Sequence, residues 1–208
     1  MQPLAYTTPL EPGNFYHIYN RGNNRQNVFR LAEDYQSFLN KWREFIFPVA
    51  KTFAYNLLPN HFHAIVQIRD RPISKKDLLG TSGLCKSGTP IWVSRAFTNF
   101  FISNSRTLQN RHGYHGAVFH SPFKRKLLGD DLQFDYLTAY VHYNAIRHGL
   151  FSGAPDQCVN SSYPVLLGEE PSFLERDYML EYFGGRDGFI AYHEGMADIL
   201  GLRDDLEA

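Results

Sequence analysis

The chain has 208 residues and a mass of 24.0 kDa, with 43% hydrophobic and 20% charged residues, which is typical of one folded domain with a small appendage and excludes a wholly disordered protein. Its 2 cysteines lie far apart and in no metal-binding spacing, which excludes a disulfide scaffold and a zinc ribbon. The formal net charge is zero, no apolar run is long enough to cross a membrane and the first residues form no secretory signal, so we expect a soluble, cytoplasmic protein.

The first half of the chain alternates between strand and helix patterns. Residues 15–21 are aromatic and alternating, which predicts a strand, and residues 34–47 place apolar side chains at helical spacing. Residues 52–58 and 61–68 predict two strands joined by a Pro-Asn turn, which is a β-hairpin. Residues 69–90 are rich in Gly, Pro and Lys and predict a flexible loop.

The second half continues the same pattern. Residues 93–109 predict a helix with a Phe stripe, residues 117–128 a short strand, and residues 130–147 a third helix opened by two Asp residues. This order predicts an α+β sandwich, in which helices cover one antiparallel sheet. Beyond the third helix, residues 171–183 and 188–200 predict two further helices.

The neutral net charge conceals two oppositely charged parts. Residues 1–150 carry 18 Lys and Arg against 9 Asp and Glu, whereas residues 151–208 carry 3 against 12. We therefore divide the chain into an N-terminal extension (1–14), a basic body (15–151) and an acidic helical extension (152–208). A body with a net charge of +9 attracts polyanions such as nucleic acids. The acidic extension either is simply solvated or packs on the body and modulates access to its basic surface.

Two histidines on the same strand are candidate metal ligands. His61 and His63 are separated by one residue, so their side chains point to the same face of a strand, and Phe62 points to the other. Two imidazoles can hold one divalent ion and leave its other positions open for substrate. A His-x-His pair also arises by chance in strands, so a structural role remains open.

The third helix offers candidate partners for this pair. Tyr140 and Asn144 are four residues apart and share one helix face, so a phenol and an amide oxygen could lie beside the metal. Tyr140 is otherwise a half-buried packing residue. Tyr136, one turn earlier, competes for the same role, whereas Tyr143 is rotated away and His142 is expected to be exposed or capping.

Polar and basic residues near these elements are candidate nucleic-acid contacts, because such side chains bond phosphates and base edges. They are Asn20, Arg21, Arg25, Lys124, Arg125 and Lys126. Taken singly, each of the basic residues could equally be an ordinary solvated surface residue.

Taken together, four stretches resemble the single-tyrosine transposases of the HUH superfamily, in the branch associated with repetitive extragenic palindromes. They are YHIYNRGNNRQNVF at 16–29, LLPNHFHAIVQI at 57–68, GAVFHSPFKRKLL at 116–128 and YVHYNAIRHGLF at 140–151. The resemblance covers most of residues 15–151, and the tail also looks like the C-terminal extension of some members.

The resemblance implies a ferredoxin-like sandwich that acts on single-stranded or hairpin DNA. It implies Tyr140 as nucleophile and His61, His63 and Asn144 as ligands of Mg²⁺ or Mn²⁺. Asn144 stands where the wider superfamily often has Gln, which is longer by one methylene. The expected reaction cleaves and rejoins DNA through a 5′-phosphotyrosine intermediate, and complete strand exchange would need two successive events or a homodimer.

Two other functions fit parts of the same pattern. A catalytically inactive DNA-binding protein would keep the fold and the basic surface but form no covalent adduct. A metal-dependent phosphodiesterase would use water as its nucleophile and would stay active without Tyr140.

Overall fold

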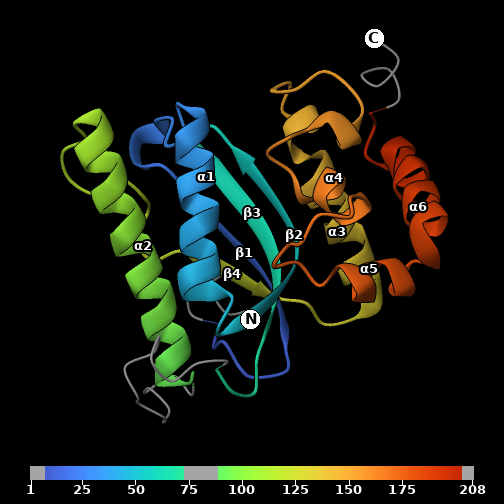
Figure 1. The fold of residues 1–208 in the computed structure, drawn as a ribbon, viewed down its shortest axis with the longest axis horizontal. Helices are drawn as coiled ribbons and strands as arrows, with labels where there is room; N and C mark the ends of the chain where they lie inside the picture. The colour runs from blue at the N-terminus through green and yellow to red at the C-terminus, as the bar shows by residue number, and fades with distance from the viewer. Residues whose placement is uncertain (1–7, 73–88, 203–208) are drawn as a thin grey trace.

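The computed structural model describes residues 8–72 and 89–202. Its centre is a four-stranded antiparallel sheet in the order β2-β3-β1-β4 (Figure 1). The strands are β1 (Phe15–Arg21), β2 (Ala50–Leu58), β3 (His61–Ile68) and β4 (Lys124–Leu127). The bounds of β1 and β3 agree with those expected from the alternating sequence pattern.

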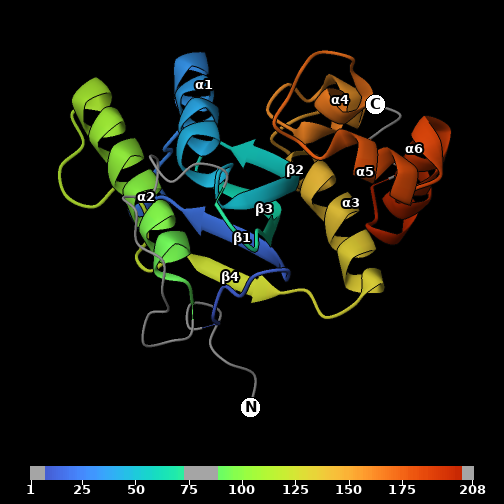
Figure 2. The same cartoon turned by 60° about the horizontal axis from the view of Figure 1, so that its bottom comes forward.

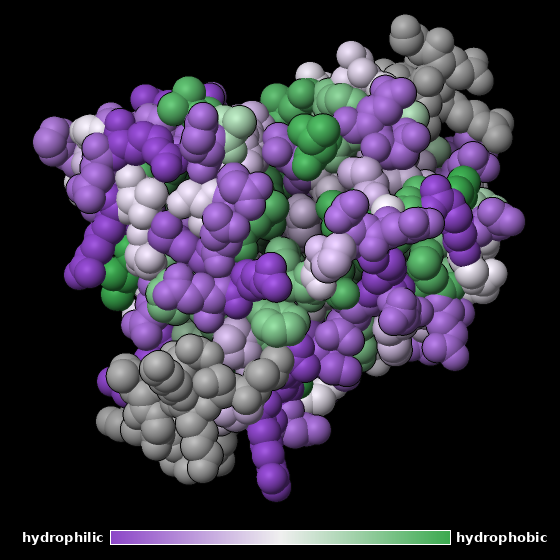
Figure 3. All heavy atoms as spheres, in the orientation of Figure 1, coloured by the Kyte–Doolittle hydropathy of each residue, from purple (hydrophilic) through white to green (hydrophobic). Residues whose placement is uncertain are grey.

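Two helices cover one face of this sheet. They are α1 (Ala32–Lys41), which continues as a π-helical turn (Trp42–Ile46), and α2 (Ile91–His112). Figure 2 shows both helices on the same side of the strands. Phe62 projects from β3 toward them, and its ring centroid lies 4.9 Å from that of Phe38 on α1. The exposed surfaces of α1 and α2 are mostly hydrophilic (Figure 3), as expected for amphipathic helices on a core.

The order β1-α1-β2-β3-α2-β4, with both helices on one face, is the ferredoxin-like arrangement. The predicted α+β class is therefore confirmed. In the described part of the chain, no helix is long and apolar enough to cross a membrane.

The opposite face of the sheet is covered by α3 (Asp131–Arg147). Asp130 caps this helix, because its carboxylate accepts a hydrogen bond from the Gln133 amide at 2.8 Å. Near its C-terminal end, Asn56 on β2 donates from Nδ2 to the carbonyl oxygens of Val141 and His142, at 2.9 and 3.1 Å. These bonds attach α3 directly to the sheet.

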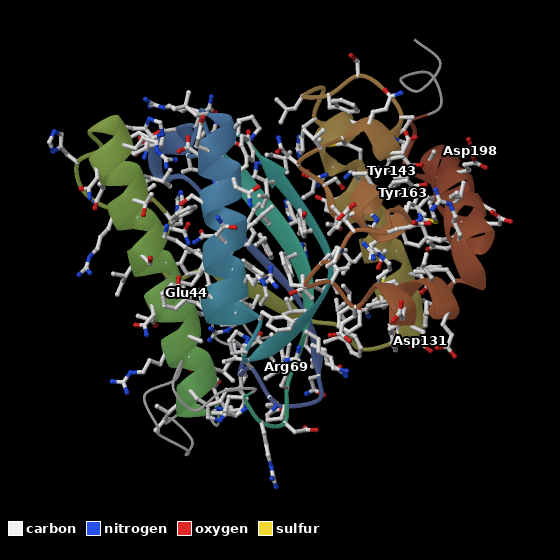
Figure 4. All side chains as sticks on the ribbon, in the orientation of Figure 1. Glu44, Arg69, Asp131, Tyr143, Tyr163 and Asp198 are labelled. Carbon is white, nitrogen blue, oxygen red and sulfur yellow. The ribbon has the colours of Figure 1, made fainter. Side chains whose placement is uncertain are left out.

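Three helices of the acidic extension pack on α3 and cover the edge at β2. They are α4 (Ser162–Leu167), α5 (Arg176–Tyr182) and α6 (Gly185–Ile199). A second small core lies between α3 and the extension, and Tyr143, Ile146 and Met196 belong to it. Figure 4 shows Tyr143 and Tyr163 in this region, on the side of α3 away from the sheet. α3 is therefore buried on two sides.

His142 corrects one expectation from the sequence. It is fully buried instead of exposed, with Nδ1 2.8 Å from His193 Nε2 on α6 and Nε2 2.8 Å from Ser162 Oγ on α4. The sequence concealed this role because both partners belong to the extension, far along the chain.

The remaining differences concern element ends. The helix expected at 171–183 begins only at Arg176, because Leu174 still pairs with Thr52 of β2 as a parallel bridge. The sequence also gave no indication of α4. The expected loop at 69–90 lies mostly outside the described residues. In the N-terminal extension, Leu10 is fully buried in the core and its amide donates to Thr89 Oγ1 at 3.0 Å.

Candidate active site

The two histidines of β3 lie on the face of the sheet that α3 covers. Phe62 between them is fully buried on the opposite side, as strand alternation requires. His61 is half-buried near the hairpin turn, whereas His63 is only 8% exposed and lies farther along the strand. Their ring centroids are 5.2 Å apart, so both imidazoles border the same space.

α3 brings both of its predicted side chains to this space. The Tyr140 ring centroid lies 5.8 Å from that of His63, and Asn144 Oδ1 lies 3.3 Å from His61 Nε2. The structure therefore places Tyr140, Asn144, His61 and His63 together. Tyr136 stacks on Tyr140 at a centroid separation of 6.3 Å and is more exposed.

The Nδ1 atom of each histidine has a partner that the sequence analysis did not identify. His61 Nδ1 lies 2.6 Å from Asn60 Oδ1, in the turn between β2 and β3. His63 Nδ1 lies 2.8 Å from Nε2 of His17, which is on β1. The alternation of the strand predicts that His17 shares a face with Tyr19. The sequence did not show that β1 pairs with β3, which is what brings His17 to His63.

Burial keeps these imidazoles neutral at neutral pH. It is the largest effect on each of them and lowers the pKa of His17 to about 4 and that of His63 well below its usual value. Burial also lowers the pKa of His61, although the hydrogen bond that protonated His61 would donate to Asn144 partly opposes this shift.

The His61 and Asn144 atoms that carry free lone pairs are suitable ligands for a divalent cation. An amide oxygen only accepts, so neutral His61 donates from Nδ1 to Asn60 and turns the lone pair of Nε2 toward Asn144 Oδ1. Two acceptors thus face each other, a contact that either a shared cation or a turn of the Asn144 amide by about 180° would make favourable. Two ligands bound at about 2.1 Å to one ion lie about 3.0 to 3.4 Å apart, which matches the 3.3 Å observed.

The Asn144 amide adds a second observation. Its Nδ2 is buried and has no hydrogen-bond partner among the described residues. Within the same residues, no three His, Cys, Asp or Glu side chains gather around a possible metal position. A cation here would therefore depend on two imidazoles and one amide oxygen.

A cavity of about 600 Å³ opens beside the histidines and is rimmed by cationic and aromatic side chains. Its lining includes Tyr19, Asn20, Arg21, Arg25, His120, Lys124 and His148. Arg25 has a positive φ of 57° in the turn after β1. His148, at the end of α3, lies with its ring centroid 5.4 Å from that of His61.

The cavity lining includes four of the six predicted DNA-contacting residues, Asn20, Arg21, Arg25 and Lys124, but not Arg125 or Lys126. Lys126 is opposite His17 in the β1–β4 register and so shares the sheet face of the histidines. Arg125 points to the other face, where its Nε donates to the Thr8 carbonyl oxygen at 2.6 Å. Asn20 is buried, and its Nδ2 donates to the His120 carbonyl oxygen at 2.9 Å.

One similar solved structure is that of a REP-associated tyrosine transposase bound to a REP hairpin. It aligns with a TM-score of 0.55 and 12% sequence identity, over 80% of this chain and 86% of that chain. No family model and no curated protein matches this chain. At this identity the likeness shows the fold.

Proposed function

We propose that this protein is a metal-dependent, single-tyrosine DNA transposase that cleaves and rejoins single-stranded or hairpin DNA. The observation that carries the proposal is the meeting of Tyr140 and Asn144 from α3 with His61 and His63 from β3 in one space. The fold shared with a hairpin-bound tyrosine transposase supports it.

Tyr140 supplies the nucleophile. Its Oη forms a bond to the scissile phosphorus while the bond to the 3′-oxygen breaks, which leaves a 5′-phosphotyrosine and a free 3′-OH. Because one phosphodiester replaces another, rejoining to a second 3′-OH needs no nucleotide triphosphate. The T-shaped contact with His63 holds the Tyr140 ring against the histidine pair.

His61, His63 and Asn144 would hold a Mg²⁺ or Mn²⁺ ion. When bound, the ion supplies positive charge to a non-bridging phosphate oxygen and so makes phosphorus more electrophilic. Asn144 is fully buried, so its amide oxygen keeps a fixed position relative to His61. The two imidazoles are uncharged at neutral pH and thus ready to act as ligands.

The rim of the cavity would bind the DNA. Arg21, Arg25 and Lys124 lie around its mouth and carry the positive charge that phosphates require. Tyr19 is half-buried beside them and offers an aromatic face for an unpaired base, as in other single-strand binders. The Lys124 Nζ lies 5.8 Å from the Tyr19 ring centroid, so base stacking and phosphate binding would occur side by side.

The test is covalent capture. The full chain is incubated with labelled hairpin and single-stranded oligonucleotides and Mn²⁺, and a protein–DNA band that resists denaturation is sought. Tyr140→Phe should abolish this band, because it removes only the attacking oxygen. Tyr136→Phe is the matched control, since it lies one turn away and stacks on the same ring.

The outcomes separate the three functions. An adduct that persists in Tyr140→Phe would exclude the assigned nucleophile. If the Tyr140→Phe variant still cleaves the DNA but forms no adduct, the nucleophile is water instead. Binding without cleavage or adduct, in the presence of Mn²⁺ or Mg²⁺, would indicate a DNA-binding protein without activity.

A further inference from the structure

His17 and His63 form a buried pair that shares one proton. The His17 Nε2 and His63 Nδ1 atoms lie 2.8 Å apart, and the side chains are 7% and 8% exposed. The residues are diagonal neighbours on adjacent strands, since His17 faces Ile65 and His63 faces Tyr19 in the register. Between two neutral imidazoles at this distance, one nitrogen donates and the other accepts.

The direction of this bond decides what His63 can do. If Nδ1 of His63 donates, its Nε2 keeps a lone pair and can bind a cation. If Nε2 of His17 donates instead, the proton of His63 sits on its own Nε2 and blocks that nitrogen. A ligating histidine ordinarily donates its other N–H to a neighbouring acceptor, which fixes both the tautomer and the ring orientation.

Asn60 is hydrogen-bonded to Nδ1 of His61 as His17 is to Nδ1 of His63. Here the direction of the bond is fixed, because an amide oxygen only accepts. The Asn60 Oδ1 accepts from His61 Nδ1 at 2.6 Å. The Asn60 backbone is itself held, because its carbonyl oxygen accepts from the Gly22 amide at 2.8 Å. An acceptor anchored in the hairpin turn thus faces the first histidine, and an imidazole nitrogen that is able to accept faces the second from the neighbouring strand.

We propose that His17 and Asn60 are positioning residues, which hold the Nδ1–H tautomers of His63 and His61 and so direct both Nε2 lone pairs toward one cation. This inference rests on the metal site of the proposed function. Neither residue touches the substrate, and each acts through the histidine to which it is bonded.

The decisive measurement is the tautomer itself. Long-range ¹H–¹⁵N correlation spectra of the full chain with ¹⁵N-labelled histidine distinguish the two tautomers without DNA, both metal-free and with saturating Mg²⁺. We expect Nδ1–H signals for His61 and His63. His17→Phe keeps a ring beside Tyr19 but removes the acceptor, so His63 should shift toward Nε2–H and Mn²⁺ should bind about 10- to 100-fold more weakly.

Conservative variants separate positioning from simple packing. His17→Gln places an amide oxygen as far along the side chain as Nε2, so it should restore most of the Mn²⁺ affinity. Asn60→Ala should change the His61 tautomer and lower affinity, whereas Asn60→Asp should keep the acceptor and both properties. His115→Phe, at an exposed loop position, is the control and should alter neither.

The inference is overturned if His17→Phe and Asn60→Ala leave both tautomers unchanged and Mn²⁺ affinity within about 2-fold of the original. Should His17→Phe fail to fold, Asn60→Ala still decides for Asn60, because that side chain lies at a partly exposed turn. The original chain then decides for His17, since an Nε2–H signal from metal-free His63 would overturn its role. Failure of the proposed function looks different: the tautomers and Mn²⁺ affinity would respond as expected, but no variant, nor the original chain, would form a DNA adduct.

Discussion

Arg147 lies two turns after Tyr140 on α3 and covers its ring. The guanidinium carbon is 4.8 Å from the ring centroid, which is a cation–π contact at the exposed edge of the site. A phenol attacks phosphorus effectively only as negative charge develops on its oxygen, and a nearby cation stabilises that charge. Arg147→Gln should therefore slow adduct formation about 2- to 30-fold, from a contact worth about 0.5 to 2 kcal/mol.

Single-turnover adduct formation with saturating oligonucleotide measures this effect. Arg147→Lys should lose less, because it keeps the charge. Arg106→Gln on α2 removes an arginine from the opposite side of the sheet and should leave the rate unchanged. Equal rates for Arg147→Gln and Arg106→Gln would show that the cation over the ring does not contribute.

Spacing predicted the two pairs of the candidate site and the resemblance joined them, but the supporting residues could not be predicted. The alternation of a strand and the period of a helix put His61 with His63 and Tyr140 with Asn144, and the structure brings the two pairs together. His17 depends on strand order, because it meets His63 only when β1 lies beside β3. Local periodicity contains no information about strand order.

At the scale of elements, Asp34 connects the start of α1 to the end of α2. Its buried carboxylate accepts from the amides of Arg30 and Leu31, at 2.9 and 3.0 Å, and pairs with Arg111 and His112. Burial alone would raise the pKa of Asp34, but these four hydrogen bonds together lower it, so the carboxylate is charged in the folded protein.

Asp34→Ala should therefore cost about 2 to 4 kcal/mol of unfolding free energy, since it removes these bonds and leaves donors without partners. Denaturant unfolding monitored by circular dichroism measures the cost. Glu33→Ala is the matched control in the same turn and should cost less than about 1 kcal/mol, because Glu33 is exposed. Similar costs for the two variants would contradict the structural role of Asp34.

The elements expected from the sequence were most accurate where one face is buried. The hairpin and α3 were predicted closely, because their apolar periods are regular. The helix expected at 171–183 begins late, because pairing of Leu174 with β2 holds the preceding residues extended. A tertiary contact thus overrides local helical propensity there.

At the scale of the whole molecule, a directed chain of hydrogen bonds joins the extension to the body. His193 Nδ1 donates to the Phe189 carbonyl oxygen at 2.8 Å, so its Nε2 accepts from His142 Nδ1. His142 Nε2 then accepts from Ser162 Oγ at 2.8 Å, and that oxygen accepts from the Tyr55 amide. Protonation of His193 would set its Nε2–H against the Nδ1–H of His142.

This arrangement predicts a loss of stability in acid. Burial, the largest effect, lowers the pKa of His193 from 6.5 to about 4, so below pH 6.5 the unfolded chain binds a proton that the folded chain does not. Stability is thus complete above pH 6.5 and decreases from there to about pH 4, by up to about 1.4 kcal/mol per pH unit for this residue. Burial lowers the pKa of His142 in the same direction.

Unfolding free energies measured between about pH 7 and about pH 5 test this dependence. His193→Gln keeps a polar side chain of similar reach but does not titrate, so its stability should decrease less steeply with acid than that of the original chain. His115→Gln replaces an exposed histidine and should leave the slope unchanged. Parallel slopes for the original chain and His193→Gln would contradict the prediction.

The double burial of α3 has a consequence for how the proposed reaction would proceed. The sheet holds one side of this helix through Asn56, and α6 holds the other through Tyr143, whose hydroxyl donates to the His193 carbonyl oxygen at 3.0 Å. Moving α3, and Tyr140 with it, away from the histidines would break the contacts on both sides of the helix. A DNA end joined to Tyr140 would therefore stay at the place of cleavage. The incoming strand would have to move to this fixed position for rejoining.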